Sequence, residues 1–285
     1  MTTDTLAQFS YFQWKDIYHK EKPYYLYIDP PEGVPVANFS TAPGPNEVVH
    51  NLRGVEDRFN LDDNGFTVKH QEFCLETIDE DAVKKFYLPS LETLLRELLG
   101  SDAEIFWFDW RTRSSDKSKT TFSPGTKINL DDRTIDLAPV TAVHVDQTKV
   151  AAVNRVHRHM GKRAEELLKG RVRIINIWRP YDVCVESYPI AVLDGSTVPP
   201  EKLVDVDVVR QSYIGESYYP LQHDGYQWYF VDKQTKEDVL LFKMYDSCEV
   251  AKAKCCPHAS FNQRTTGESK PRQSIEARAL VFTAA

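Results

Sequence analysis

The sequence lacks a basic excess and long apolar runs. Its 35 Lys and Arg residues are outnumbered by 42 Asp and Glu residues, so the formal net charge is −7 at pH 7. Nucleic-acid-binding domains usually carry a basic surface, and a membrane-spanning helix needs about 20 consecutive apolar residues. We therefore expect neither a nucleic-acid partner nor insertion into a membrane.

The N-terminus and the cysteines argue against two further classes. Residues 1–5 contain neither the basic nor the apolar region of a secretory signal, so we expect a cytoplasmic protein. Five cysteines form an odd set in a chain of 285 residues, which argues against a disulfide framework. The adjacent pair Cys255 and Cys256 does not have the spacing of a zinc site, and we interpret both as buried, reduced thiols.

Strand signals dominate the second half of the chain. Short apolar or alternating segments are separated there by turn residues, a pattern typical of a closed antiparallel barrel or jelly roll. These segments are 171–177, 184–193, 204–213, 226–231, 239–245 and 274–282. Helices are predicted at 79–87, 91–99, 148–160 and 162–169. The expected fold is therefore mainly β with flanking helices.

The tripeptide His144-Val145-Asp146 lies in a predicted strand at 141–146. Residues i and i+2 of a strand face the same way, so His144 and Asp146 would point together into a barrel. His258 follows more than a hundred residues later, between two predicted strands. Two histidines and one carboxylate on one face of a metal are the ligands of non-haem iron(II) oxygenases. Zinc can bind the same set together with water, so these three residues leave the metal open.

A basic element follows the second histidine. Arg272 and Ser274 stand at i and i+2 at the start of the last predicted strand, so both could face the barrel. A guanidinium group matches a carboxylate through two parallel hydrogen bonds. We therefore predict that Arg272 and Ser274 bind the carboxylate of a keto-acid cosubstrate. Arg278 is a second candidate for this role or for substrate binding, and the alternative for Arg278 is an ion pair with Glu276.

The remaining histidines in polar contexts are poorer metal ligands. His157 and His159 lie in a predicted helix, where residues two apart do not share a face. His223 lies in a predicted turn. We expect none of the three to bind the metal.

Five motifs occur in an order known from one enzyme family. They are His144–Gln147, Asn176–Pro180, Tyr213 with Gly215 and Glu216, Cys256–Phe261, and Pro271–Arg278. Together they resemble a largely fungal iron(II)/2-oxoglutarate-dependent hydroxylase/desaturase family, the gibberellin-desaturase and AsaB-like enzymes. The resemblance extends from about Phe106 to Phe282, and the first hundred residues match the family less closely.

The resemblance implies a double-stranded β-helix, a cupin-like jelly roll, that uses Fe(II), 2-oxoglutarate and dioxygen. It implies that His144, Asp146 and His258 hold the iron and that Arg272 binds 2-oxoglutarate. Asn176 would reach the keto acid or the substrate from a neighbouring strand. Some enzymes of this kind oxidise amino acids, and one type closes an aziridine ring, so an amino acid is a candidate substrate.

Four residues are candidates for binding the substrate. Arg111 and Arg113 follow an aromatic strand and could hold a substrate carboxylate. The alternative is that both are solvated where the chain enters the polar segment 114–125. Arg179 and Tyr213 belong to the motifs of the family.

The sequence thus predicts a single catalytic domain, residues 1–285. Residues 1–105 would form variable strands and helices of an outer layer and lid, and residues 106–285 the jelly-roll core with the metal site. The predicted reaction abstracts hydrogen from an unactivated C–H bond of a small natural-product precursor, giving hydroxylation, desaturation or oxidative cyclisation. The alternatives are a zinc-dependent hydrolase or cupin-type isomerase, and a non-catalytic ligand-binding barrel. We expect a monomer or a homodimer.

Overall fold

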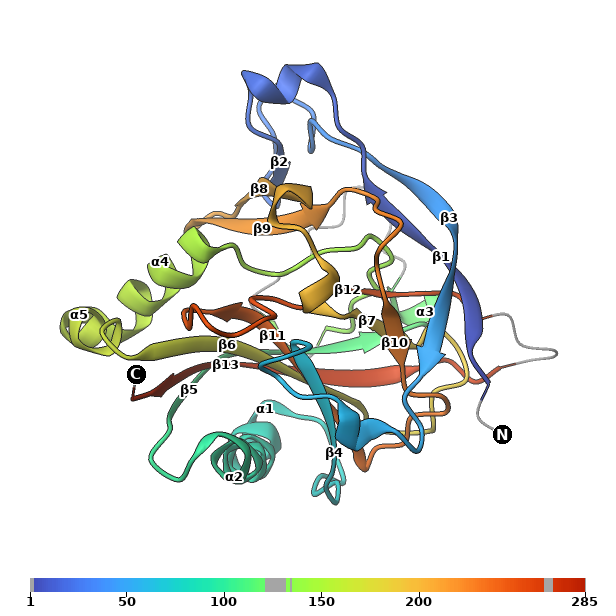
Figure 1. Ribbon diagram of the computed structural model, residues 1–285, viewed down its shortest axis with the longest axis vertical. Helices are drawn as coiled ribbons and strands as arrows, with labels where there is room; N and C mark the ends of the chain where they lie inside the picture. Colours follow the sequence, from blue (N-terminus) through green and yellow to red (C-terminus); the bar gives the residue numbers. More distant parts are fainter. Residues whose placement is uncertain (1–2, 121–131, 134, 264–268, 285) are drawn as a thin grey trace.

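The computed structural model describes residues 3–120, 132–133, 135–263 and 269–284, so the end of the predicted polar segment 114–125 lies outside it. Two five-stranded sheets face each other and a three-stranded sheet lies at one end (Figure 1). The first contains, in order, β1 (Thr5–Phe12), β3 (Thr41–Asn51), β10 (Trp228–Phe230), β7 (Ile190–Leu193) and β12 (His258–Ser260). The second contains β4 (Phe66–His70), β11 (Asp238–Asp246), β6 (Arg171–Pro180), β13 (Gln273–Thr283) and β5 (Glu104–Ser114). The third contains β2 (Tyr24–Leu26), β8 (Leu203–Val209) and β9 (Ile214–Pro220). The predicted mainly β jelly roll is confirmed.

The core between the two large sheets is built by alternating side chains. Trp178 of β6 and Phe242 of β11 belong to the cluster between the sheets. Their neighbours Ile177 and Leu241 belong to a second cluster on the outer face of the same sheet. Because both faces of β6 and β11 are buried, both strands have apolar residues at consecutive positions, as at 174–175 of β6 and 239–242 of β11.

Helix α2 (Leu88–Leu99) covers this outer face (Figure 1) and buries Leu91, Leu94 and Leu95 against it. Helix α1 (Glu80–Ala82) and the π-helical turn η3 (Val83–Tyr87) lead directly into α2. The sequence predicted two helices separated near Pro89, but the helical path is continuous. Pro89 lies in the first turn of α2, where its missing N–H is tolerated.

Helix α4 (Lys149–Met160) confirms the helix predicted at 148–160. It begins after Thr148, whose hydroxyl oxygen accepts a hydrogen bond from the Ala151 N–H at 3.1 Å, a favourable N-terminal cap. Shorter helical elements complete the fold. They are α3 (Lys117–Thr120), α5 (Ala164–Leu167), and the 3₁₀ turns η1 (Asp16–His19), η2 (Glu56–Arg58), η4 (Gly161–Arg163), η5 (Gly195–Thr197) and η6 (Pro200–Lys202).

The first 105 residues contribute strands to both large sheets, which differs from the predicted division at residue 105. Strands β1 and β3 form part of one sheet, and β4 lies at the edge of the other. Pro43 and Pro45 of β3 precede the short stretch, Val49–Asn51, that pairs with β10. Proline is tolerated where a strand has a free edge.

The segment predicted as a strand at 141–146 forms isolated bridges instead of a ladder. Ala142 bridges to Ser10, His144 to His258, and Val145 to Tyr218. The predicted strand 184–193 is also shorter, with pairing only in β7, and β9 was not predicted. Each bridge reaches a different partner, which local alternation along the chain does not reveal.

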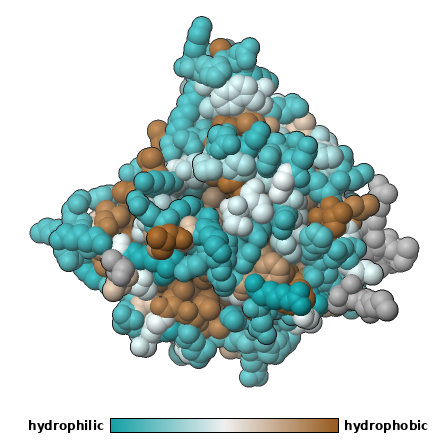
Figure 2. Space-filling view, in the orientation of Figure 1, coloured by the Kyte–Doolittle hydropathy of each residue, from teal (hydrophilic) through white to brown (hydrophobic). Residues whose placement is uncertain are grey.

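Large apolar side chains are mostly inside the molecule. On the face shown in Figure 2, apolar residues form small separate patches among hydrophilic ones. Among the described residues, no helix has both the length and the apolar content needed to cross a membrane.

Candidate metal centre and adjoining pocket

His144, Asp146 and His258 are brought together, with one ligand atom from each lying within 4.8 Å of the others. His144 and His258 exchange backbone hydrogen bonds of 3.2 and 3.0 Å across their bridge. Val145 is held by its own bridge to Tyr218 of β9. The i and i+2 spacing then brings Asp146 beside His144, as predicted from the sequence.

Both imidazole rings are oriented by backbone carbonyl groups. Nδ1 of His144 lies 2.9 Å from the carbonyl oxygen of Ala142, and Nδ1 of His258 lies 3.3 Å from that of Cys256. A carbonyl oxygen only accepts hydrogen bonds, so each Nδ1 carries the proton and each Nε2 offers a lone pair. This orientation is typical of histidines that bind a metal through Nε2.

The two oxygens of Asp146 have different surroundings. Oδ2 accepts a hydrogen bond from Asn176 Nδ2 at 2.7 Å and pairs with Arg278 Nη2 at 3.1 Å. Oδ1 lies 3.5 Å from Nε2 of His144. The carboxylate therefore offers one oxygen to the space between the histidines while the other is already bound.

Electrostatics hold His258 and Asp146 in the states that bind a cation. Burial and the neighbouring His144 lower the pKa of His258 to about 3, so the ring is neutral at pH 7. Burial opposes ionisation of Asp146, but the positive charge of Arg278 holds its pKa well below the usual range. One anionic and two neutral ligands leave a divalent ion with room for further ligands.

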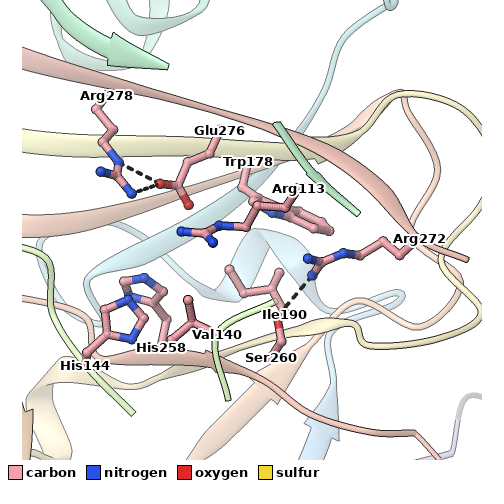
Figure 3. A pocket seen from close by; sticks show the side chains of 10 residues that line it. All are labelled: Arg113, Val140, His144, Trp178, Ile190, His258, Ser260, Arg272, Glu276 and Arg278. Atoms are coloured by element: carbon pink, nitrogen blue, oxygen red, sulfur yellow. Dashed lines mark hydrogen bonds and ion pairs between the residues drawn. The ribbon is translucent and has the colours of Figure 1, made fainter. Parts of the chain in front are cut away.

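A pocket adjoins the triad, and the guanidinium group of Arg272 enters it (Figure 3). Its lining combines polar and apolar side chains from several strands: Arg113, Val140, His144, Trp178, Ile190, His258, Ser260, Arg272, Glu276 and Arg278. Arg272 Nη1 donates to the Tyr188 carbonyl at 2.8 Å and to Ser260 Oγ at 3.0 Å. Its guanidinium carbon lies 5.4 Å from the ring of Trp178.

Arg272 is a buried cation with unused donors. It is 1% exposed, and within the described part of the chain its Nε and Nη2 have no hydrogen-bond partner. Burial and the nearby charge of Arg113 lower the pKa of Arg272 to about 9. An unpaired buried charge is costly, so this pocket suits an anion that can accept two hydrogen bonds.

Ser274 and Asn176 each carry a buried polar atom without a described partner. These atoms are Ser274 Oγ and Asn176 Oδ1. Ser274 pairs in register with Arg113 of β5, and Asn176 reaches the Asp146 carboxylate. Asn176 therefore contacts a predicted metal ligand directly, whereas the sequence placed it against the keto acid or substrate.

Arg278 forms the ion pair with Glu276 that the sequence offered as its alternative. Its Nη2 lies 2.6 Å from Glu276 Oε1, and its Nη1 lies 3.5 Å from Asp109 Oδ2. Together with Asp146, these carboxylates surround the guanidinium group with negative charge. Arg278 thus supports the triad, and Arg272 is the arginine with free donors.

The four candidate substrate residues lie in different places. Arg113 lines the pocket, and Arg111 is buried beside Asp109 at 3.5 Å. Tyr213 packs under Arg158, whose guanidinium carbon lies 4.3 Å from the ring. The structure does not support the substrate-binding role predicted for Arg179, because its guanidinium group lies away from the pocket.

Arg179 lies on the opposite face of β6. It donates to the backbone carbonyls of Gln71 and Lys236 at 3.1 and 3.0 Å, and its guanidinium carbon lies 5.4 Å from the Tyr87 ring. Asn176 and Arg179 are three residues apart, so strand alternation alone places them on opposite faces.

The two hydrogen-bond partners of Arg272 were not identified from the sequence. Ser260 stands two residues after His258 in β12 and faces the same side, a relationship that alternation could have revealed. Tyr188 supplies its carbonyl oxygen to Arg272 from a backbone with φ of 47°. Nothing in the local sequence indicates this left-handed conformation for a tyrosine.

A sequence profile described as "Oxidoreductase/YMDC permease-like domain" matches residues 9–282. The chain is 30% identical over 272 residues to the protein named "Fe(II)/2-oxoglutarate-dependent dioxygenase nvfI" of Aspergillus novofumigatus, covering 92% of this chain and 91% of that protein. It is 31% identical over 249 residues to "Hydroxylase/desaturase efuI" of Hormonema carpetanum, covering 82% of each.

A solved structure has the same fold along the whole chain. It is titled "iron and alpha-ketoglutarate-dependent endoperoxidase NvfI with different conformation" and superposes with a TM-score of 0.84 at 28% identity. The match covers 100% of both chains. The fold similarity therefore includes the N-terminal strands that the sequence motifs did not cover.

Proposed function

Since the chain belongs to the family of Fe(II)/2-oxoglutarate-dependent dioxygenases, we propose that it oxidises a small natural-product precursor at an unactivated C–H bond. Fe(II), 2-oxoglutarate and dioxygen are the cofactor and cosubstrates of this reaction. The single observation that carries the proposal is the arrangement of the His144, Asp146 and His258 ligand atoms beside the free donors of Arg272.

We assign iron binding to Nε2 of both histidines and to Oδ1 of Asp146. The basis is that Nδ1 of each ring and Oδ2 of the carboxylate already have partners. When bound, iron and 2-oxoglutarate supply the oxidising chemistry that removes hydrogen from the substrate.

We assign the far carboxylate of 2-oxoglutarate to Arg272. Its Nε and Nη2 can donate two hydrogen bonds to one carboxylate, and such a bond neutralises the buried charge. Ser274, whose buried Oγ lacks a described partner, is the second candidate donor. Asn176 and Arg278 orient Asp146.

Apolar side chains form one part of the pocket wall beside the triad. Trp178 packs under the Arg272 guanidinium, and Val140 and Ile190 complete the wall (Figure 3). Apolar surroundings strengthen the electrostatic interaction between Arg272 and a carboxylate, because they lower the local dielectric constant. They also protect a reactive site from side reactions with solvent.

The outcome at carbon is hydroxylation, desaturation or oxidative cyclisation, and the pocket residues named above do not select among them. The family relationship favours oxygen chemistry over the zinc hydrolase, the cupin-type isomerase and the non-catalytic barrel. A single catalytic domain, a cytoplasmic location and a monomer or homodimer stay predictions.

The test is a substrate screen of the purified protein with Fe(II), 2-oxoglutarate and air. We expect succinate release that depends on one substrate of the panel, with amino acids tested first. Product mass separates gain of one oxygen atom from loss of two hydrogen atoms. If protein with bound iron develops no 2-oxoglutarate-dependent visible absorption without oxygen, the proposed function is wrong.

A further inference from the structure

Arg278 is shared by three carboxylates, which divide its guanidinium group unequally. Its Nε and Nη2 lie 2.7 and 2.6 Å from one oxygen of Glu276, Oε1 (Figure 3). Nη2 also reaches Oδ2 of Asp146 at 3.1 Å, and Nη1 lies 3.5 Å from Oδ2 of Asp109. The edge formed by Nε and Nη2 is therefore held most closely by Glu276, and Asp146 receives one longer contact.

Asn176 joins two of these carboxylates from the neighbouring strand. Its Nδ2 donates to Oδ2 of Asp146 at 2.7 Å and to Oε1 of Glu276 at 3.4 Å. Asp146 and Glu276 therefore share two donors, Arg278 Nη2 and Asn176 Nδ2. The four side chains form a closed ring of contacts to which each carboxylate contributes a single oxygen.

The ring of contacts follows from the pairing of β6 with β13. Asn176 and Arg278 stand opposite each other in the register of these strands, and Glu276 stands opposite Trp178. Glu276 and Arg278 are two residues apart on β13, so they share a face, and both line the pocket beside the triad. Glu276 is 4% exposed, so packing as well as the ion pair restricts its carboxylate.

A different pairing between Arg278 and Asp146 would interfere with the metal. A guanidinium group frequently binds a carboxylate through two parallel hydrogen bonds, one to each oxygen. Such a pair would occupy both Oδ1 and Oδ2 of Asp146. Oδ1, which lies 3.5 Å from Nε2 of His144, is the oxygen assigned to iron. In the observed arrangement, the contact of Arg278 with Asp146 is to the other oxygen, Oδ2.

Arg278 keeps its positive charge in this position. Burial disfavours the charged form, but the negative charges of Asp146, Glu276 and Asp109 hold the pKa of Arg278 above its usual value. A charged guanidinium group between two carboxylates can turn toward either of them. The shorter contacts with Glu276 show which carboxylate holds it here.

We propose that Glu276 is a positioning residue, which holds the Nε and Nη2 edge of Arg278 and thereby keeps Oδ1 of Asp146 available to the metal. The inference rests on the proposed function, because Asp146 is one of the assigned iron ligands. Without the Glu276 carboxylate, Arg278 turns to Asp146 and pairs with both of its oxygens. A metal ion then has to displace the guanidinium group before Oδ1 can bind it.

The test titrates the full chain with Co(II), whose visible absorption reports both its affinity and its ligands. Glu276→Gln removes the charge at nearly constant shape, whereas Glu276→Asp keeps the charge and withdraws it by one methylene group. Both variants should bind Co(II) about tenfold more weakly than wild type, because neither holds Arg278 in place. Asp109→Asn is the matched control and should lose much less affinity, since Asp109 contacts Nη1 of the same guanidinium group.

A double-mutant cycle separates positioning from a general effect of charge. In protein that already carries Arg278→Gln, Glu276→Gln should cause no further loss of Co(II) affinity, because no guanidinium group remains to be held. Thermal unfolding of the metal-free proteins identifies the variants that fold. Full affinity in a folded Glu276 variant, a loss that persists beside Arg278→Gln, or an equal loss in Asp109→Asn overturns the inference. Wild-type protein that binds no Co(II) overturns the proposed function instead.

Discussion

Arg278 Nη2 lies 3.1 Å from Oδ2 of Asp146, on the same oxygen that accepts the hydrogen bond from Asn176. The contact joins the last strand, β13, to the extended segment that carries His144. It leaves Oδ1 as the oxygen directed at the histidine pair. Arg278 therefore positions Asp146, one of the three proposed metal ligands.

The substitution Arg278→Gln should weaken metal binding by about 10- to 100-fold, because the Asp146 carboxylate loses the partner that orients it. Titration with Co(II), followed by its visible absorption, measures the affinity. Arg133→Gln is the matched control, since Arg133 pairs with Asp109 at 3.2 Å and not with Asp146. Equal losses in the two variants would show a general effect of charge instead of positioning.

Removal of His258 should abolish the visible absorption that develops with Fe(II) and 2-oxoglutarate in the absence of oxygen. The neutral Nε2 of this buried ring is one of the three assigned iron ligands. His157→Ala is the control, because His157 is exposed on α4 and contacts Glu165 at 3.8 Å. A His258→Ala protein that keeps the full absorption contradicts the assignment.

Arg272→Met should stabilise the protein without 2-oxoglutarate and prevent its binding. Burial lowers the pKa of Arg272 to about 9, a measure of how unfavourable the unpaired charge is. Its removal should raise the free energy of unfolding by about 1 kcal/mol, as is common when a functional charge is replaced. Thermal unfolding with and without 2-oxoglutarate measures both effects.

The wild-type protein should gain thermal stability from 2-oxoglutarate, and the Arg272→Met variant should gain none. Metal binding should be unchanged, because Arg272 contacts none of the three assigned ligands. A variant that is less stable in both conditions would mean that Arg272 serves the fold and not the cosubstrate.

Asp246→Asn should destabilise the fold by about 3–5 kcal/mol at neutral pH. Asp246 pairs with Lys243 at 2.5 Å and with Arg171 at 2.6 Å, and the side chains of Lys243 and Asp246 are both 0% exposed. The substitution removes the nearer anion of a buried ammonium group, whose other carboxylate partner, Asp62, lies 3.7 Å away. Urea unfolding measures the change, and Asp63→Asn, which breaks an exposed pair with Lys252, should have little effect.

The cost of Asp246→Asn should shrink in acid. Burial opposes ionisation of Asp246, but Arg171 and Lys243 lower its pKa below the usual range. A lowered folded-state pKa contributes stability above the unfolded-state pKa and loses it as pH falls through the folded-state value. The difference between wild type and variant should therefore decrease below about pH 4, and a difference independent of pH would exclude the ion pairs as its cause.

Much of the site could be predicted because it follows strand alternation. His144 and Asp146 are two residues apart, and so are His258 and Ser260, and each pair shares a face. The same rule would have excluded Arg179, which is an odd number of residues from Asn176. Helix α4 was also predictable, since Thr148 caps it through local contacts.

Other features depend on contacts that no local pattern encodes. The segment at 141–146 has extended backbone, but its bridges lead to Ser10, His258 and Tyr218 in turn. Strands β1 and β3 belong to one large sheet and β4 to the other, although all motifs of the family lie after residue 105. Long-range pairing decides these points, and its register is not visible in composition or periodicity.

The types of the proposed ligands, their spacing and the shared face of His144 and Asp146 follow from the sequence, because side-chain direction alternates with every residue of an extended chain. The tertiary structure decided which oxygen of Asp146 is free, which arginine is paired and which is not. Arg272 and Arg278 have the same chemistry and lie six residues apart in one segment of the chain. Arg278 is surrounded by three carboxylates, whereas Arg272 is surrounded by a carbonyl group, a hydroxyl group and an aromatic ring.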